Sequence, residues 1–367
     1  MPSDARPADA MSLDVMPPDA MPSDAMPSPA AALPGDALPG DALRLAMRSF
    51  RVSSDRAALA QIASSFGGFI ASFAAIYALT VTVSPLFLLA TPIAAGFLVR
   101  IFIIQHDCGH GSFLRSKGAN DRLGFVCSLI TLAPYASWRR QHAGHHGVWN
   151  DLDRRDRGVD IYSTCLTTEE YAALSRRGRL WHRISRHPLV THLMLPPVVF
   201  ILLYRLPFDM PAGWRQERRA LLLTNLSLAG LYGGLGLALG FGPLLTVAVP
   251  IMVTASIIGV WLFGVQHRFE GAHWARHAEW NETDASLRGS SYLRLPRVLQ
   301  WFTGNIGFHH LHHLDPRIPN YRLEACHAAV PALRRVTTLN LWKALRAPSF
   351  ILWDETRGAM VPLPRAA

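Results

Sequence analysis

The chain has 367 residues, of which half are hydrophobic and only 17% are charged, whereas a soluble domain usually carries about 25% charged residues. This composition indicates a protein that contacts lipid. The net charge of +10 does not predict nucleic-acid binding, because the basic residues recur between apolar stretches instead of forming one compact run. Four widely spaced cysteines without a CxxC pair indicate neither a disulfide framework nor a thiolate zinc site, and we expect reduced thiols.

Residues 1–43 repeat short units such as MPSDA and LPGDA, which are rich in Pro, Ala and Asp and contain no aromatic residue. Such a segment cannot bury enough apolar surface to offset the entropy lost on ordering, so we expect it to be disordered. It lacks the basic region and continuous apolar region of a signal peptide.

Four apolar runs follow, and each has about the 20 residues that a helix needs to span a bilayer. They lie at residues 62–83, 86–104, 220–240 and 243–265. The turn within each pair carries no charge, whereas arginine and lysine cluster in the other segments. By the positive-inside rule these basic segments face the cytoplasm. We therefore expect an all-α integral membrane protein, with four transmembrane helices as two hairpins and a cytoplasmic helical cap. Residues 44–347 would form this membrane domain, and residues 348–367 a C-terminal tail.

Two further apolar segments are too short to be assigned as spans. Residues 188–203 include Pro196 and Pro197, and a crossing there would place the histidines on its two sides on opposite faces of the membrane. We expect this segment to be interfacial or re-entrant. Residues 123–135 are also predicted to be interfacial.

Sixteen histidines is a high number, and most of them fall in three clusters that read HDCGH, HAGHH and HHLHH. Residues at i, i+3 and i+4 share one helix face, so each cluster directs its imidazoles towards one point. This spacing selects His106, His110, His142, His145, His146, His309, His312 and His313. Neutral imidazole binds iron, zinc, copper and nickel, and eight imidazoles exceed the usual four ligands of one zinc ion. Two metal ions are the expected number.

A ninth ligand is predicted at His267, which follows the last apolar run in VQHRFE as His106 follows the second run in IIQHDC. His310 lies about 100° from His309 on a helix, so we expect it behind the ligands. The remaining histidines near the boxes are read as ordinary surface residues: His182, His187, His192, His273, His277 and His327.

Carboxylates close to the boxes are candidates for orienting the imidazoles through N–H···O bonds. These candidates are Asp107, Asp153, Asp160 and Glu270. Pairing with arginines in a charged surface loop is an equally good interpretation for Asp151 and Asp156.

At these residues the sequence resembles the membrane fatty acid desaturase family, and more narrowly its acyl-lipid omega-6 (delta-12) type branch in bacteria and plastids. The resemblance covers residues 65–345 and rests on HDCGHGSF, QHAGHH, VQHRFE and NIGFHHLHHLDPRIPNYRL. It implies that the nine histidines hold two iron ions, that O2 is the co-substrate, and that a membrane lipid acyl chain is the substrate. For a bacterial member it implies the cytoplasmic (inner) membrane, with the active site on the cytoplasmic face.

Two departures from the family pattern bear on partners. The loop reads LDRRDRGVDIY where LDRRGxGD is expected, which bears on substrate or partner contacts. No HPGG haem-binding motif is present, so we expect a separate electron donor, with ferredoxin as the first candidate.

The histidine boxes are also compatible with two other functions. Alkane hydroxylases, carotene ketolases and hydroxylases, and sterol oxidases carry similar histidine boxes, so oxygen insertion is the nearest alternative reaction. A non-enzymatic metal-binding membrane protein is a remote alternative, because the apolar runs contain essentially no polar path. Trp138, Trp149 and Tyr135 are candidates for the mouth of a substrate cavity, although interfacial placement is usual for these residue types.

Overall fold

The computed structural model describes residues 40–82, 86–157 and 164–364. Most of the N-terminal repeat lies outside the described residues. Its last residues, 40–43, begin helix α1 (Gly40–Met47). Leu43 and Met47 of α1 are buried in an apolar cluster with Leu311 and Leu314, so this end of the segment belongs to the folded protein.

Four long helices correspond to the four apolar runs. They are α2 (Asp55–Val81), α3 (Phe87–His110), α9 (Arg215–Leu239) and α10 (Phe241–His267). Each is long and apolar enough to cross a bilayer. Large apolar side chains on these helices remain exposed, including Ile70, Leu89, Leu222 and Leu237. Such surfaces fit a membrane protein, because lipid would cover them.

Two of these helices continue past the ends that the apolar runs predict. α3 runs on from Ile104 to His110, and α10 runs on from Val265 to His267, so histidines predicted to be ligands stand on rigid helices. α3 ends where Gly111 adopts a left-handed φ of 69°, which allows its N–H to bond the carbonyl of Cys108.

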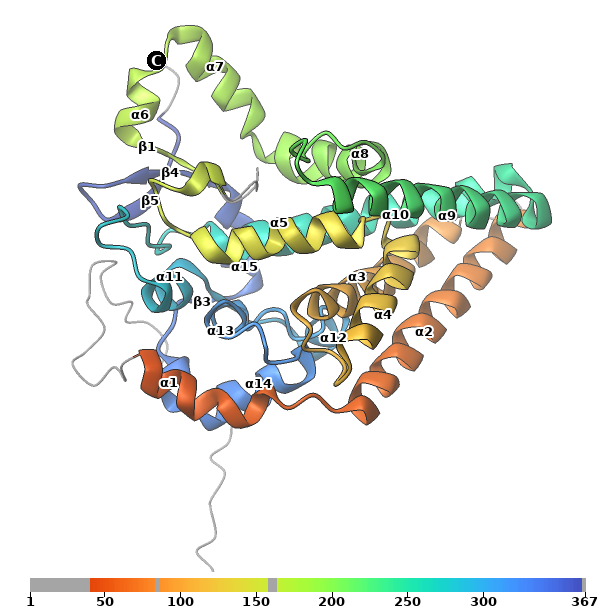
Figure 1. Cartoon of the computed structure of the whole chain (residues 1–367). Coiled ribbons are helices and arrows are strands. Elements are labelled where there is room, and N and C mark those ends of the chain that lie inside the picture. The colour runs from red at the N-terminus through yellow and green to blue at the C-terminus, as the bar shows by residue number, and fades with distance from the viewer. Residues whose placement is uncertain (1–39, 83–85, 158–163, 365–367) are drawn as a thin grey trace, which may run out of the picture.

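α10 contacts α2, α3 and α9, and α2 also packs along α3. Ala94 and Ala95 of α3 are fully buried in the same cluster as Val247 and Ile251 of α10, where small side chains let the two helices approach closely. Figure 1 shows the long helices extending to one side of the molecule, with most short helices and the strands at the other end.

Residues 188–203 form a π-helical turn (Leu189–Met194) followed by α8 (Leu195–Ile201). With α7 (Arg176–Ser185) they make a helix pair bent by 45°, a geometry of a broken span or a re-entrant loop. α8 packs against α10. Pro196 and Pro197 lie in the first turn of α8, where the missing N–H groups cost no helical hydrogen bond.

Shorter helices complete the helical part of the described chain. They are α4 (Lys117–Thr131), α5 (Tyr135–Val148), α6 (Thr168–Ala173), α11 (Glu282–Gly289), α12 (Arg297–Phe302), α13 (His309–Leu314), α14 (Asn320–Ala329) and α15 (Leu341–Arg346). Single 3-10 turns occupy Arg48–Arg51, Arg155–Arg157, Leu203–Arg205, Pro331–Arg334 and Ala347–Ser349. The segment 123–135 therefore belongs largely to α4, which packs on α3.

The described residues are mostly helical, as predicted, but they also contain five short strands that the all-α prediction did not include. They are β1 (Leu166–Thr167), β2 (Tyr292–Leu293), β3 (Thr338–Leu339), β4 (Phe350–Asp354) and β5 (Ala359–Pro362). β4 pairs with β1 in parallel and with β5 antiparallel, and β2 pairs with β3 in parallel. The segment expected as a C-terminal tail thus contains a hairpin, whose turn includes Gly358 at a φ of 60°. Two-residue strands leave too little alternation to be predicted from sequence.

Candidate metal centre

The nine predicted histidines come together from four helices, α3, α5, α10 and α13. Seven of them form two groups, and within each group the ligand nitrogens lie within 4.8 Å of one another. The first contains His106, His110, His142 and His312, and the second contains His145, His267 and His313.

The other two histidines adjoin these groups. His146 Nε2 lies 3.2 Å from His142 Nε2 and 3.0 Å from His312 Nε2, beside the first group. Its ring also stacks on that of His313, with centroids 4.2 Å apart. His309 Nε2 lies 3.0 Å from His267 Nε2, beside the second group.

The spacing of the nitrogens matches the spacing of ligands on a shared ion. Two imidazole nitrogens bound at about 2.1 Å to one metal are about 3.0 to 3.4 Å apart at octahedral or tetrahedral angles. In the second group, His145 Nε2 is 3.1 Å from His267 Nε2 and 3.4 Å from His313 Nε2. In the first group, the buried Nε2 atoms of His106 and His110 have no hydrogen-bond partner among the described residues. A metal ion would satisfy both atoms.

Four of the imidazoles on α5 and α13 are held in their neutral form. Burial, and then neighbouring imidazoles, keep the pKa values of His142, His146, His312 and His313 well below the ordinary range. A neutral ring keeps a lone pair for a metal, so the environment favours ligation over protonation.

Asp107 is the predicted carboxylate that contacts the cluster. Its Oδ1 lies 2.9 Å from His106 Nδ1. Asn320 holds the other oxygen, because its backbone N–H and side-chain N–H donate to Asp107 Oδ2 at 2.6 and 2.8 Å. This role of Asn320, which lies in the IPNYRL stretch, was not predicted, because an asparagine at a helix start usually has a local structural role.

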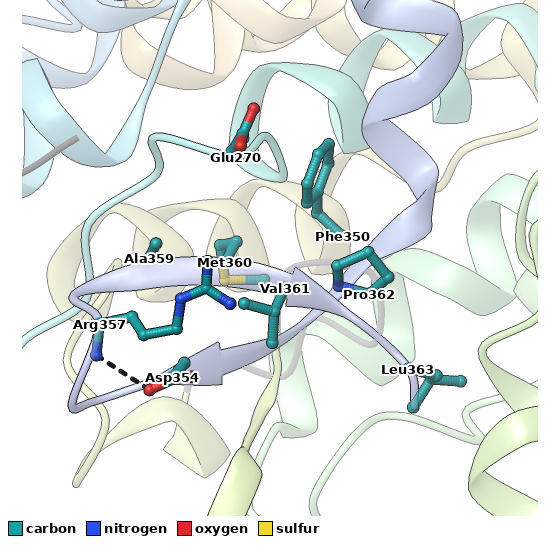
Figure 2. Close-up of a pocket in the computed structure, with 9 residues that line it drawn as sticks. All are labelled: Glu270, Phe350, Asp354, Arg357, Ala359, Met360, Val361, Pro362 and Leu363. Carbon is teal, nitrogen blue, oxygen red and sulfur yellow. Dashed lines mark hydrogen bonds between the residues drawn. The ribbon is translucent and has the colours of Figure 1, made fainter. Parts of the chain in front are cut away.

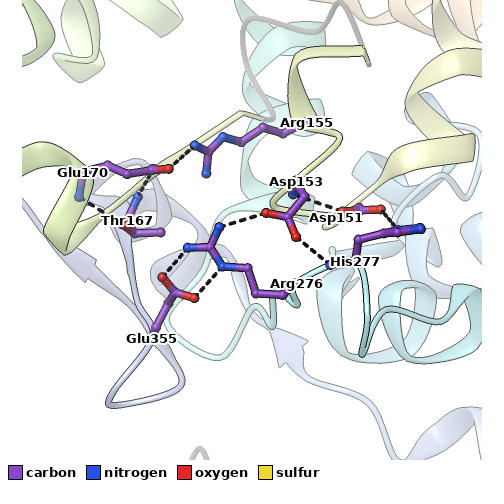
Figure 3. Close-up of polar contacts among 8 residues, drawn as sticks. All are labelled: Asp151, Asp153, Arg155, Thr167, Glu170, Arg276, His277 and Glu355. Atoms are coloured by element: carbon purple, nitrogen blue, oxygen red, sulfur yellow. Dashed lines mark hydrogen bonds and ion pairs between the residues drawn. The ribbon is translucent and has the colours of Figure 1, made fainter.

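Asp153 contacts arginine instead of imidazole ligands. It accepts hydrogen bonds from Arg276 and from the backbone N–H of His277, and Arg276 also binds Glu355 through two bonds (Figure 3). The buried carboxylate of Asp151 lies 2.7 Å from Nδ1 of His277. This network fastens the loop after the second histidine box to the C-terminal hairpin. Asp151 lies beside an arginine as well as an imidazole, because Arg154 Nε is 3.8 Å from its Oδ2.

Glu270 and His310 were also predicted to lie behind the ligands, and neither side chain points into the histidine cluster. Glu270 is exposed and lines a separate pocket of about 450 Å³ against β4 and β5, with Asp354 and Arg357 (Figure 2). His310 points to the opposite face of α13, where its ring lies 5.4 Å from that of His327 and 6.3 Å from that of Tyr292. Asp160 lies outside the described residues.

A cavity of about 560 Å³ reaches the cluster. Its wall includes His106, His142, His145 and His309, and its remaining lining is mostly apolar. The lining residues outside the cluster come mainly from α3, α8 and its flanks, and α10.

The three aromatic residues predicted at a cavity mouth have different places. Trp138 lines the cavity and stacks on the ring of His142 at 4.7 Å, with Gly109 leaving room for its ring. Trp149 is buried against His267, with centroids 4.0 Å apart. Tyr135 is buried and donates its hydroxyl to the carbonyl of Cys108.

Phe263 was not predicted as a site residue. It lines the cavity, and its ring centroid lies 5.2 Å from that of His145 and 4.9 Å from that of His267. One turn before His267 on α10, it reads in the sequence as one more residue of an apolar span.

Comparison with known proteins agrees with this geometry. Residues 43–342 match the model of the fatty acid desaturase family. The chain is 44% identical to a fatty acid desaturase of Bacillus subtilis over 76% of this chain and 78% of that protein. It is 26% identical to an sn-1 oleoyl-lipid 12-desaturase of Picosynechococcus over 64% of this chain and 65% of that protein. It is 28% identical to a chloroplastic sn-2 acyl-lipid omega-3 desaturase (ferredoxin) of Helianthus annuus, over 64% and 53% of the two chains. The chain therefore belongs to the fatty acid desaturase family and is an oxidoreductase.

Proposed function

We propose that this enzyme uses O2 and two iron ions to introduce a cis double bond, of the delta-12 (omega-6) type, into the acyl chain of a membrane lipid. The observation that carries the proposal is a mostly apolar cavity whose wall includes members of both histidine groups, His106 and His142 from the first and His145 from the second.

The nine histidines would hold the metals. His106, His110, His142 and His312 would bind one iron, and His145, His267 and His313 the other. His146 and His309, which adjoin the two groups, would complete the ligand set. Iron bound there would supply, with O2 and two electrons, the oxidising strength needed to remove hydrogen from an unactivated methylene, which no side-chain base can deprotonate.

The protein's own task is to position the acyl chain. The cavity volume lies within the usual range for small-molecule sites, and its apolar lining matches an alkyl chain. The charged residues Arg155, Asp156 and Arg186 also line it, and this polar part suits a lipid headgroup. With the head fixed there, the length of chain that reaches His106 and His145 selects which carbon–carbon bond lies beside the metals.

The positions of the histidines on the spans support the proposed membrane topology. His110 and His267 are the last residues of α3 and α10, so the cluster lies at one end of the two helices. The basic segments around the boxes would place that end on the cytoplasmic face of the inner membrane, with the four helices as two hairpins.

The reaction needs electrons from outside this chain. We take ferredoxin as the donor, because one relative carries ferredoxin in its name and because no haem-binding HPGG motif occurs in this sequence. The delta-12 assignment takes its support from the relatives named as 12-desaturases.

Fatty acid methyl esters from a host that makes this protein together with a ferredoxin and its reductase would test the proposal. We expect new dienoic acids with the wild-type chain and none with His312→Ala. Oxygenated products without new double bonds would contradict desaturation and support hydroxylation.

A further inference from the structure

The cluster of nine histidines has one edge that is less buried than the rest. Seven of the nine are buried, whereas His110 and His146 are only half-buried. Their rings lie 4.9 Å apart, so they form one edge of the cluster. An electron carrier that cannot enter the protein approaches the metals most closely there.

Three segments meet next to His110, at one end of this edge. They are residues 48–56, residues 111–117, which directly follow His110, and residues 315–321, which directly follow α13. Ser53 donates its hydroxyl to the carbonyl of Ser112 at 2.6 Å. Arg115 donates its Nε–H to the carbonyl of Ser53 at 3.2 Å, so the first two segments are joined side by side.

The third segment is attached through a buried carboxylate. Asp315, the residue after α13, has almost no exposure and accepts from both Arg51 and Arg317. Tyr321 accepts from the backbone N–H of Ser54 at 2.9 Å. These contacts hold the surface in a fixed position relative to the helix that carries the third histidine box.

The surface made by these segments is strongly basic. We call it the basic rim, and it consists of Arg48, Arg51, Arg56, Arg115, Lys117 and Arg317. The same segments contain only two acidic residues, Asp55 and Asp315, and Asp315 is buried. Five of the six cations are exposed and Arg51 is partly exposed. A surface with this excess of positive charge attracts acidic partners from a distance.

The basic rim also stands clear of the hydrocarbon. α2 has 27 residues and is about 40 Å long, against roughly 30 Å of hydrocarbon core. Its apolar run starts near Ile62, so the first seven residues, from Asp55, extend about 10 Å beyond the core. The rim precedes and adjoins this end, where a soluble protein can reach it.

We propose that the basic rim is the docking surface for a small, acidic, one-electron carrier protein, which delivers electrons to the edge of the cluster at His110 and His146. This inference rests on the proposed function, because a desaturation that reduces O2 to water takes up two electrons for each double bond. Anionic lipid headgroups are the competing occupant.

The test compares two triple charge reversals in the purified, iron-loaded enzyme in phosphatidylcholine nanodiscs. The rim variant is Arg48→Glu/Arg56→Glu/Lys117→Glu, which leaves the contacts of Asp315 intact. The control variant is Arg176→Glu/Arg177→Glu/Arg357→Glu, with the same change in charge on exposed residues of α7 and the C-terminal hairpin. Figure 1 shows α7 at the top of the molecule and α1 at the bottom, with β4 and β5 of the hairpin between them on the left. The probe is a reduced plant-type [2Fe–2S] ferredoxin, whose binding and KM are measured at low and high salt.

We expect the rim variant to bind ferredoxin at least about tenfold more weakly at low salt and to lose most of the salt dependence of binding. The control variant should match the wild type. Turnover with dithionite and methyl viologen should stay within about twofold of wild type in both variants, because a small reductant needs no docking surface.

Equal ferredoxin affinity in the rim and control variants would overturn the inference. Equal affinity together with weaker binding to vesicles that contain phosphatidylglycerol would assign the rim to headgroups. A parallel fall of ferredoxin-driven and dithionite-driven turnover would show a structural role and also overturn it. A wild-type enzyme that forms no double bond with either reductant would instead refute the proposed function.

Discussion

Individual side chains hold the imidazoles in orientation. The ring of His106 is set by Asp107, and that carboxylate is fixed in turn by two hydrogen bonds from Asn320. His142 lies flat against Trp138, and His267 packs on Trp149. Such contacts restrict each ring before any metal binds, which reduces the cost of assembling the site.

Removing one histidine ligand should cause the loss of iron only from the group to which that histidine belongs. His312→Ala removes a ligand from the first group, and His145→Ala removes one from the second. We expect each variant to lose activity and about half of the bound iron, with membrane insertion unchanged, as measured by iron analysis of purified protein. His187→Ala, on an exposed residue, is the control and should behave as wild type. Substantial activity in His145→Ala would contradict the ligand scheme.

Asp107→Asn should weaken iron binding without abolishing it. The amide keeps the shape of the carboxylate but loses the charge that favours the N–H of His106, and outer partners of this kind are typically worth about 10-fold to 100-fold in metal affinity. The measurement is iron retention against a graded chelator. Asp121→Asn is the matched control, because Asp121 contacts Arg139 and Tyr135 but no histidine. Equal iron loss in the two variants would show that Asp107 acts only on folding.

Among the elements, α10 does most to shape the substrate cavity. Six residues from Met252 to Leu262 line it, and the small Ala255, Ser256 and Gly259 leave space for a chain to pass. A Cβ added at Gly259 would meet no atom within 4 Å. The residue therefore borders open space, and a larger side chain there would fill part of the cavity.

Gly259→Leu should shift the enzyme towards shorter acyl chains or move the double bond along the chain, because the added side chain takes up space needed by several methylenes. Product analysis of fatty acid methyl esters measures both effects. Gly230→Leu is the control, since Gly230 is exposed on α9 and a Cβ there also meets nothing within 4 Å. An unchanged product distribution for Gly259→Leu would mean that the acyl chain lies elsewhere.

The sequence predicts those helices and those histidine contacts that apolar runs, helical spacing and charge clusters indicate. The four long helices follow from their apolar runs, and the convergence on one site of His142, His145 and His146 follows from helical spacing. The rotation of a short helix within the fold is not recorded in that way, so the sequence could not show that His310 faces His327. The contact between Asp107 and Asn320 joins residues 213 positions apart, which no local pattern predicts.

Across the whole molecule, distant segments are fastened together around the site. Arg276 joins the loop after the second box to the C-terminal hairpin, through Asp153 and Glu355 (Figure 3). Both ion pairs are partly exposed, so each contributes only modestly to stability. Their value lies in linking segments that are more than 200 residues apart.

Arg276→Ala should lower the unfolding temperature of the enzyme slightly but measurably, because two partly exposed ion pairs are lost together. Thermal unfolding in detergent, followed by circular dichroism, measures the change. Arg297→Ala removes one highly exposed pair with Glu324 and should lower the unfolding temperature less than Arg276→Ala does. If the two variants proved equally stable, the network of Arg276 would not fasten the hairpin.

The nine histidines span residues 106–313, and only the complete fold brings them together. The account therefore depends most directly on the metal content of the intact protein. Iron measured per chain, in enzyme purified without added zinc, should reach two equivalents and accompany desaturase activity. Clearly fewer than two irons per chain, with zinc restoring function, would contradict a di-iron desaturase.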